Sequence, residues 1–134
     1  RVDLVGLRGG ITRGNVFGCG VDEYLRERLN IQESNSPESN FDKLALGRLE
    51  YFVTGYYTGM ALLLKRGDEE RFVVKMPFLT DTPNYLVLTR NGKCADKLEQ
   101  IDARLALLKK NGVLEELIRK SFQKWKAQPT LVER

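Results

Sequence analysis

Two short polar segments contain residue types that suit the binding of a small molecule. In the first segment, glycines stand on both sides of Thr12, Arg13 and Asn15. A glycine turn between a strand and a helix leaves backbone N–H groups at the helix N-terminus, where anions are favoured. The three side chains add further hydrogen-bond donors. The segment lacks the Gly-Lys-Ser/Thr of a Walker A loop and the GxGxxG spacing. It therefore predicts a small anion-binding turn, and the alternative is a tight turn that binds nothing.

The second segment runs from Thr54 through Gly55, Tyr56 and Tyr57 to a second threonine and glycine. It follows a predicted strand, and open α/β sheets bind their ligands at the carboxyl ends of strands. Tyrosine rings can stack on a planar group while hydroxyls hydrogen-bond its polar edge. The alternative is that one tyrosine belongs to the core and the other to the surface.

The composition argues against common forms of catalysis. The chain has no histidine, so it cannot by itself form a Ser-His-Asp triad, a Cys-His pair or a histidine-containing zinc site. Asp42 and Glu50 are the acidic residues nearest the two segments, and nothing pairs them as an acid/base dyad. We therefore predict no catalytic residues, no metal site and no cofactor.

Charge and cysteine content narrow the possible partners. Lys and Arg number 22 against 18 Asp and Glu, for a net charge of +4, and the two signs are interspersed along the chain. A nucleic-acid-binding protein usually gathers its positive charge on one face, so no nucleic-acid partner is predicted. Cys19 and Cys94 form no CxxC motif; they either pair in an oxidising compartment or are small buried residues.

These segments need a scaffold, and the hydrophobic pattern predicts an α/β domain. Strands are predicted over residues 4–7, 31–34, 49–53, 71–76 and 84–89. Helices are predicted from residue 21 to 29, from the Ser36-Pro37 start to Gly47, from 60 to 67, from 98 to 111 and from 114 to 125. Because strands and helices alternate, the sheet should be mostly parallel. We expect one compact domain over 1–128, with a core of 1–80, a returning strand and two C-terminal helices within 81–134, and a frayed tail at 129–134.

The order of these elements resembles a known family. Residues 3–14 (DLVGLRGGITRG) resemble the DL-x-G-x-x-(I/V)-(G)-x-x-x-G entry into the second lobe of family 3 extracellular solute-binding proteins. These proteins are the periplasmic amino-acid-binding components of ABC importers. Residues 44–52 (LALGRLEYF), 85–90 (YLVLTR) and 98–125 are similar to the family's Gly-Arg element, its returning strand and its closing helices. The resemblance covers nearly the whole chain, and it implies a single lobe of the type II periplasmic-binding-protein-like fold.

The resemblance also implies the site residues. The family's ligand groups on this lobe correspond by position to Asn15, Val16 and Phe17 and to the segment from Thr54 to Tyr56. Two positions depart from the family pattern. Asn15-Val16 stands where amino-acid binders often have Ser or Thr, and Gly55 stands where an Asp holds the ligand's ammonium group. The resemblance therefore implies a ligand other than a standard α-amino acid, or a degenerate relative.

The implied function is a non-enzymatic solute-binding domain in the periplasm, with a membrane permease as partner. The chain would match about half of a two-lobed protein, so we expect the apolar faces of its C-terminal helices to be covered in a homodimer. Three alternatives stay open. They are a ligand-sensing domain of a receptor, a dehydratase-like or cell-wall-related enzyme of the same fold, and an assembly module that binds no small molecule.

Overall fold

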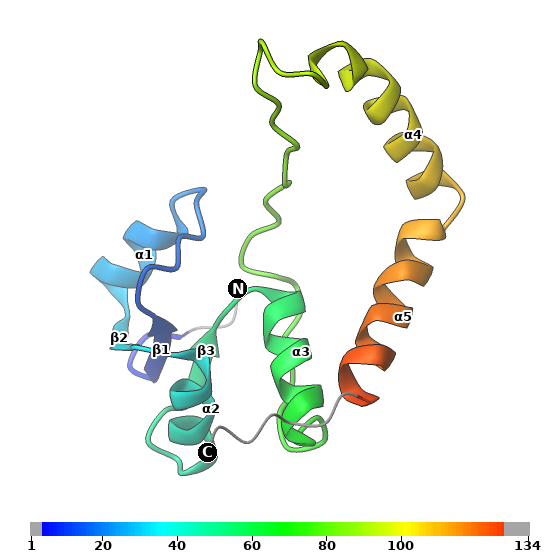
Figure 1. Ribbon diagram of the computed structural model, residues 1–134. Coiled ribbons are helices and arrows are strands. Elements are labelled where there is room, and N and C mark those ends of the chain that lie inside the picture. The colour runs from blue at the N-terminus through cyan, green and yellow to red at the C-terminus, as the bar shows by residue number, and fades with distance from the viewer. Residues whose placement is uncertain (1–3, 128–134) are drawn as a thin grey trace. The chain divides into compact units, whose positions relative to one another are not determined.

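The computed structural model describes residues 4–127 and divides the chain into two compact units (Figure 1). The first unit runs to Thr82 and contains a parallel sheet flanked by helices. The second unit begins at Pro83, and the regular elements described in it are all helical. The predicted α/β class is confirmed. The tail predicted at 129–134 lies outside the described residues.

The sheet of the first unit has three parallel strands. They are β1 (Arg8–Thr12), β2 (Asn30–Ser34) and β3 (Tyr51–Val53). Their order in space is β2-β1-β3, so the chain crosses from one side of β1 to the other between β2 and β3 (Figure 1).

Two helices cover opposite faces of this sheet. Helix α1 (Val21–Arg28) places the buried Leu25 in a core cluster with Val53, against which Ile11 packs. Helix α2 (Pro37–Ala45) packs on the other face, where its Phe41 ring meets the Phe52 ring edge-on at 5.2 Å. Because side chains alternate along a strand, the neighbours Phe52 and Val53 pack on opposite faces of the sheet.

The first strand lies later in the chain than the prediction placed it. Residues 4–7 form a turn, in which Leu7 N–H donates to the Leu4 carbonyl at 3.2 Å and Gly6 has a φ of +86°. The strand instead contains Gly9 and Gly10, which were assigned to the turn. A Cβ at Gly9 would overlap the Tyr51 ring. These two glycines are therefore sites of close packing rather than of chain reversal.

The predicted limits of α2 are confirmed. The Ser36 hydroxyl accepts a hydrogen bond from the Ser39 N–H at 3.2 Å, and Pro37 occupies the first helical position. Gly47, with a φ of +68°, follows the last turn.

Helix α3 (Tyr56–Arg66) begins earlier than predicted, because the two tyrosines lie in its first turn rather than in a preceding loop. Its predicted end at Gly67 is confirmed. Arg66 in its last turn forms ion pairs with Asp42 of α2 at 2.8 Å and with Asp68 at 3.0 Å. These contacts fix the end of α3 beside α2.

The strand predicted over residues 71–76 is not formed. Arg71 N–H donates to the Asp68 carbonyl at 3.0 Å and the Arg71 guanidinium pairs with the Asp68 carboxylate at 2.9 Å, which turns the chain back. Phe72 then packs on Phe41 of α2, with ring centroids 5.6 Å apart. The described strands β1, β2 and β3 pair only with one another, and none of them pairs with residues 71–76.

The second unit consists of an extended segment and three helical stretches: η1 (Ala95–Lys97), α4 (Leu98–Lys110) and α5 (Val113–Ala127). The two predicted C-terminal helices are confirmed. The returning strand predicted over residues 84–89 is not formed, because no described strand pairs with it. No described residue of α4 or α5 is buried. Among the described residues, none of the helices has the length and apolar character needed to span a membrane.

Candidate functional site

The strand order brings the two predicted segments to the same edge of the sheet. Ile11 of β1 is paired in register with Val53 of β3. Thr12, the last residue of β1, and Thr54, which follows β3, therefore lie at adjacent carboxyl ends of the sheet. At this point the connection from β1 leads to one side, towards β2, while β3 lies on the other side. Such a reversal of strand order is where open α/β sheets bind ligands.

A third segment, which the sequence did not associate with the site, contacts both sides of this edge. The Phe78 ring packs against Tyr56 of α3 with centroids 5.3 Å apart. Four residues later, the Thr82 hydroxyl donates to the Phe17 carbonyl at 3.3 Å. We call residues 78–82 the crossing segment, because it links the start of α3 to the loop after β1.

The loop after β1, residues 13–20, is held by hydrogen bonds to a carboxylate of the following helix. Asp22 in the first turn of α1 accepts hydrogen bonds from the N–H groups of Phe17 at 3.0 Å and Gly18 at 2.8 Å. Chiefly the Phe17 bond, and then the Gly18 bond, hold the pKa of the Asp22 carboxyl below its ordinary value. Two loop amides that were expected to bind an anion therefore already bind one.

The side chains predicted in this loop have different surroundings. The Arg13 guanidinium pairs with Glu33 of β2 at 3.3 Å, and Val16 is 82% exposed. Asn15 lies in a turn closed by its N–H to the Thr12 carbonyl at 3.1 Å. The Phe17 ring packs against the core cluster under α1, so it is part of the core.

The start of α3 presents the second group of predicted residues. Gly55 is its N-cap and provides no side-chain cap, and the first turn contains no acidic residue. Tyr56 is 44% exposed and Tyr57 56% exposed, and their rings meet edge-on with centroids 5.2 Å apart. An exposed aromatic pair beside a helix N-terminus can contact a planar group and a negative charge at once.

A polar network under the sheet edge was missed by the sequence interpretation. The fully buried Asn40 of α2 donates from Nδ2 to the Thr12 hydroxyl at 3.3 Å. On the neighbouring strand end, Lys43 Nζ donates to the buried Ser34 hydroxyl at 2.8 Å. Asn40 precedes Phe41 in α2 and contacts Gly10 and Thr12 of β1, and a polar residue that packs against a strand in this way is a sign of such a network.

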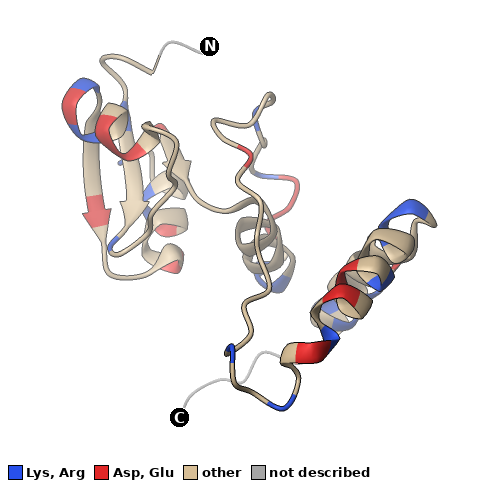
Figure 2. Ribbon diagram, turned by 90° about the horizontal axis from the view of Figure 1, so that it is seen from above, with Lys and Arg blue, Asp and Glu red and all other residues tan. Residues whose placement is uncertain are grey.

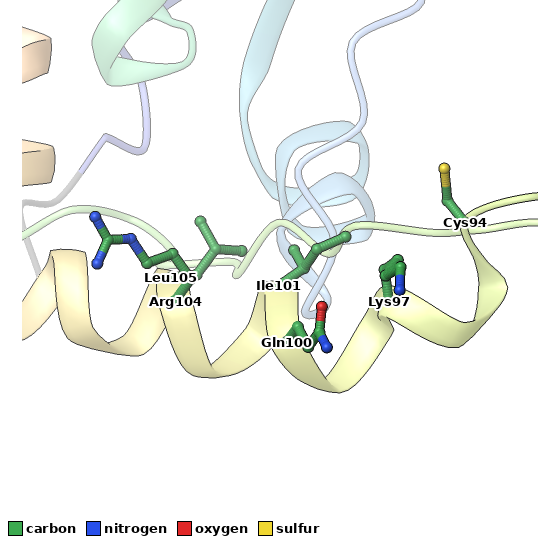
Figure 3. Close-up of a pocket in the computed structure, with 6 residues that line it drawn as sticks. All are labelled: Cys94, Lys97, Gln100, Ile101, Arg104 and Leu105. Atoms are coloured by element: carbon green, nitrogen blue, oxygen red, sulfur yellow. The ribbon is translucent and has the colours of Figure 1, made fainter.

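Other features of the described chain lie outside this edge. Within the described chain, His, Cys, Asp and Glu residues form no group of three that could hold a metal ion. In the second unit, an open hollow of about 460 Å³ runs along α4 (Figure 3). Its lining residues are Cys94, Lys97, Gln100, Ile101, Arg104 and Leu105.

Charged residues of both signs occur throughout the described chain. The ribbons of both units carry basic and acidic residues interspersed along their length (Figure 2). The ion pairs Arg13–Glu33 and Lys120–Glu116 are examples of this interspersion.

Comparisons of the chain with protein-family models, with curated proteins and with solved structures find no match.

Proposed function

We propose that the first unit is a small-molecule-binding domain that uses the carboxyl edge of its sheet. The contacts would come from residues 12–17 after β1 and from residues 54–57 after β3. In this proposal the domain binds a solute without transforming it, as a component of a periplasmic binding protein of the ABC-transporter type does.

One observation carries this proposal: the strand order β2-β1-β3 joins two polar segments that lie about forty residues apart at a reversal of strand order. The sheet geometry alone requires only that some residues lie there. Here those residues are threonines and tyrosines rather than apolar side chains, and the crossing segment touches both groups. Polar groups that converge at a switch point are typical of binding sites.

The ligand would be small, polar and partly planar. Gly55 lacks the carboxylate that would hold an ammonium group, whereas the start of α3 favours a negative charge. Because Asp22 occupies the amides of Phe17 and Gly18, the anionic group would lie between the end of β1 and the start of α3 rather than at these two amides.

A thermal-shift screen of amino acids, organic acids and polyamines tests the proposal, because a ligand that binds only the folded state raises the unfolding temperature. We expect an organic acid to raise it. Tyr56→Ala should abolish the shift, and Val73→Ala, on a side chain that is 82% exposed and lies outside both segments, is a surface control. If no compound raises the unfolding temperature, the assembly module that binds no small molecule becomes the better hypothesis.

Two further activities of the same fold are kept as alternatives. A receptor sensor would bind the same ligand and differ only in what it is attached to. An enzyme related to dehydratases would convert a cyclic acid such as prephenate, so turnover of that compound would favour it over the binding domain.

We also propose a homodimer through α4 and α5, together with a periplasmic location and a permease partner. The dimer is supported by the exposure of Leu105, Leu117 and Trp125, which are 41%, 52% and 38% exposed. Apolar faces of this kind on two amphipathic helices are usually covered by another surface. The location and the permease rest on the family resemblance alone.

A further inference from the structure

We propose that Asn40 is a positioning residue that makes the Thr12 hydroxyl a hydrogen-bond donor, so that the ligand group bound at the end of β1 is an acceptor oxygen of a carboxylate or phosphate. This inference rests on the proposed function, and it names the ligand chemistry at one point of that site. It follows from which atoms around Thr12 can donate and which can only accept.

The orientation of the Asn40 amide is set by its two partners. Its Nδ2 lies 3.3 Å from Thr12 Oγ1 and 3.4 Å from the backbone carbonyl oxygen of Ser36. A carbonyl oxygen can only accept, so the NH₂ side of the amide must face Ser36. The same NH₂ group therefore also faces Thr12. A reversed amide would bring two acceptors together at Ser36.

This orientation determines what the Thr12 hydroxyl can offer a ligand. A hydroxyl has one proton and two lone pairs, and one lone pair receives the N–H of Asn40. The proton is then directed away from Asn40. Thr12 is the last residue of β1 and is partly exposed, so that proton can reach a group at the edge of the sheet. A ligand atom that meets it must be an acceptor.

The neighbouring strand end repeats the pattern independently. Ser34 is the register partner of Thr12, and its hydroxyl accepts a hydrogen bond from the Lys43 ammonium at 2.8 Å. An ammonium only donates, so the Ser34 hydroxyl also accepts from α2 and keeps its proton for another partner. Among the described residues, no carboxylate forms an ion pair with Lys43. The two strand ends thus combine a partly exposed hydroxyl donor at Thr12 with the positive charge of Lys43, whereas the Ser34 hydroxyl is itself buried.

The packing around Asn40 fits a positioning role. Asn40 is 0% exposed, and its Oδ1 makes no hydrogen bond to any described residue. Oδ1 lies against Gly10, where a Cβ would collide with it. A buried amide whose oxygen lacks a hydrogen bond stabilises the fold less than an apolar side chain of similar size would. Of its two hydrogen bonds, to Ser36 and to Thr12, only the one to Thr12 reaches the edge of the sheet.

Thr12→Val tests the donor, because valine has the shape of threonine without its hydroxyl, and Thr12→Ser is the matched control that keeps it. The probes are acetate and inorganic phosphate, titrated into the full chain while the backbone amide resonances of residues 12 and 54 are followed. We expect the wild type and Thr12→Ser to bind one of these anions with similar Kd, and Thr12→Val to bind at least tenfold more weakly. Equal affinity of Thr12→Val and the wild type would overturn the inference.

Asn40→Asp reverses the hydrogen bond, because an ionised carboxylate accepts the Thr12 proton and leaves only lone pairs for the ligand. We expect it to weaken anion binding at least tenfold, and Thr12→Val added to it to cause little further loss. Losses that multiply would show that the two residues act separately and would contradict the positioning role.

A readout without ligand tests the contact between Asn40 and Thr12 separately from the proposed function. The side-chain amide protons of Asn40 should exchange slowly with solvent in the wild type. Their NMR chemical shifts should change in Thr12→Val but not in Thr12→Ser. If Asn40 responds and neither anion binds, the positioning contact stands, and both the acceptor assignment and an anionic ligand in the proposed function fail. If Asn40 does not respond to Thr12→Val, the positioning role is wrong even where anions bind.

Discussion

Gly9 and Gly10 show how single residues shape the sheet edge that carries the candidate site. Both lie inside β1, where glycine is usually unfavourable because it offers no side chain to pack. Here the missing side chains make room for Tyr51 on one face and for Leu49 and Asn40 on the other. The buried polar network under Thr12 therefore depends on a glycine two residues earlier.

Gly10→Ala should destabilise the fold by about 1–3 kcal/mol, because its Cβ would overlap Leu49 and the Asn40 amide in a close-packed interior. Urea denaturation measures the change. Gly55→Ala is the control: Gly55 has a φ of −63°, and a Cβ there would lie 3.7 Å from the Thr58 hydroxyl. Its effect should stay below about 1 kcal/mol, within the range of a cap change. Equal losses would contradict the packing explanation.

Asp22 predicts a pH dependence of the loop after β1. Its folded-state pKa is lowered, mainly by the Phe17 N–H, so its stabilising effect is present above its ordinary pKa and is lost as the pH falls through the lowered value. In Asp22→Asn, the free energy of unfolding should therefore fall less steeply with decreasing pH in the acid range than in the wild type. Urea titrations at a series of acid pH values measure both slopes.

Glu23→Gln is the control for this prediction, because it removes a charge from the same helical turn and leaves the hydrogen bonds from the Phe17 and Gly18 amides to Asp22 in place. We expect its pH profile to follow the wild type more closely than Asp22→Asn does. If Asp22→Asn keeps the full acid slope, the carboxylate does not hold the loop.

Among the elements, the crossing segment is the one that touches both halves of the site. It has no regular secondary structure, and it is attached through the Phe78–Tyr56 ring pair and the hydrogen bond from Thr82 to Phe17. Segments held by few contacts open at low free-energy cost. The crossing segment should therefore open at a lower free-energy cost than the sheet.

Phe78→Ala should loosen this segment without unfolding the sheet, because Phe78 is 45% exposed and contributes little to the core. We expect faster amide hydrogen exchange over residues 78–82 and nearly unchanged exchange in β1. Leu79→Ala, at a residue 51% exposed, removes a similar apolar area outside the ring pair and should change exchange less. If the two variants exchange alike, the ring pair does not anchor the segment.

Elements with local start and stop features were predictable from the sequence. The Ser36 cap, Pro37 and Gly47 fixed α2 because each acts through the backbone next to it. Strand predictions failed where a strand depends on a distant partner. Residues 71–76 have strand-forming side chains, but the Arg71–Asp68 turn and the packing of Phe72 on α2 decide their path.

At the scale of the whole molecule, the two units differ in what they bury. Every buried hydrophobic residue among those described, from Leu25 to Leu63, belongs to the first unit. In the second unit, α4 and α5 have 13 and 15 residues. Isolated helices of this length are only marginally stable in water, so their stability must come from another surface.

A fragment of residues 83–134 should accordingly have little helicity at low concentration and gain it as the concentration rises. Circular dichroism over a dilution series measures this, and residues 1–82 alone should keep a cooperative unfolding transition. For the full chain, sedimentation should show a dimer. A monomer over a wide concentration range would overturn the proposed dimer.

The candidate site was predictable in its position on the sheet but not in its detailed contacts. Strand ends and glycine turns pointed to Thr12 and Thr54, because parallel strands end at one edge. The roles of Asn40, Asp22 and Phe78 depend on contacts across the fold that no local pattern encodes. Phe17 was assigned to the ligand by its position in the chain, yet its ring packs on the core.

The central place of β1 also sets an order in which the first unit folds. Asn30 pairs with Arg8 across 22 residues, whereas Tyr51 pairs with Gly9 across 42, so closing the second loop costs about 0.6 kcal/mol more in chain entropy. We expect β1, α1 and β2 to assemble first and β3 to add last. Because Thr54 and the start of α3 arrive with β3, a chain that has folded only partway has no site at which to hold a ligand.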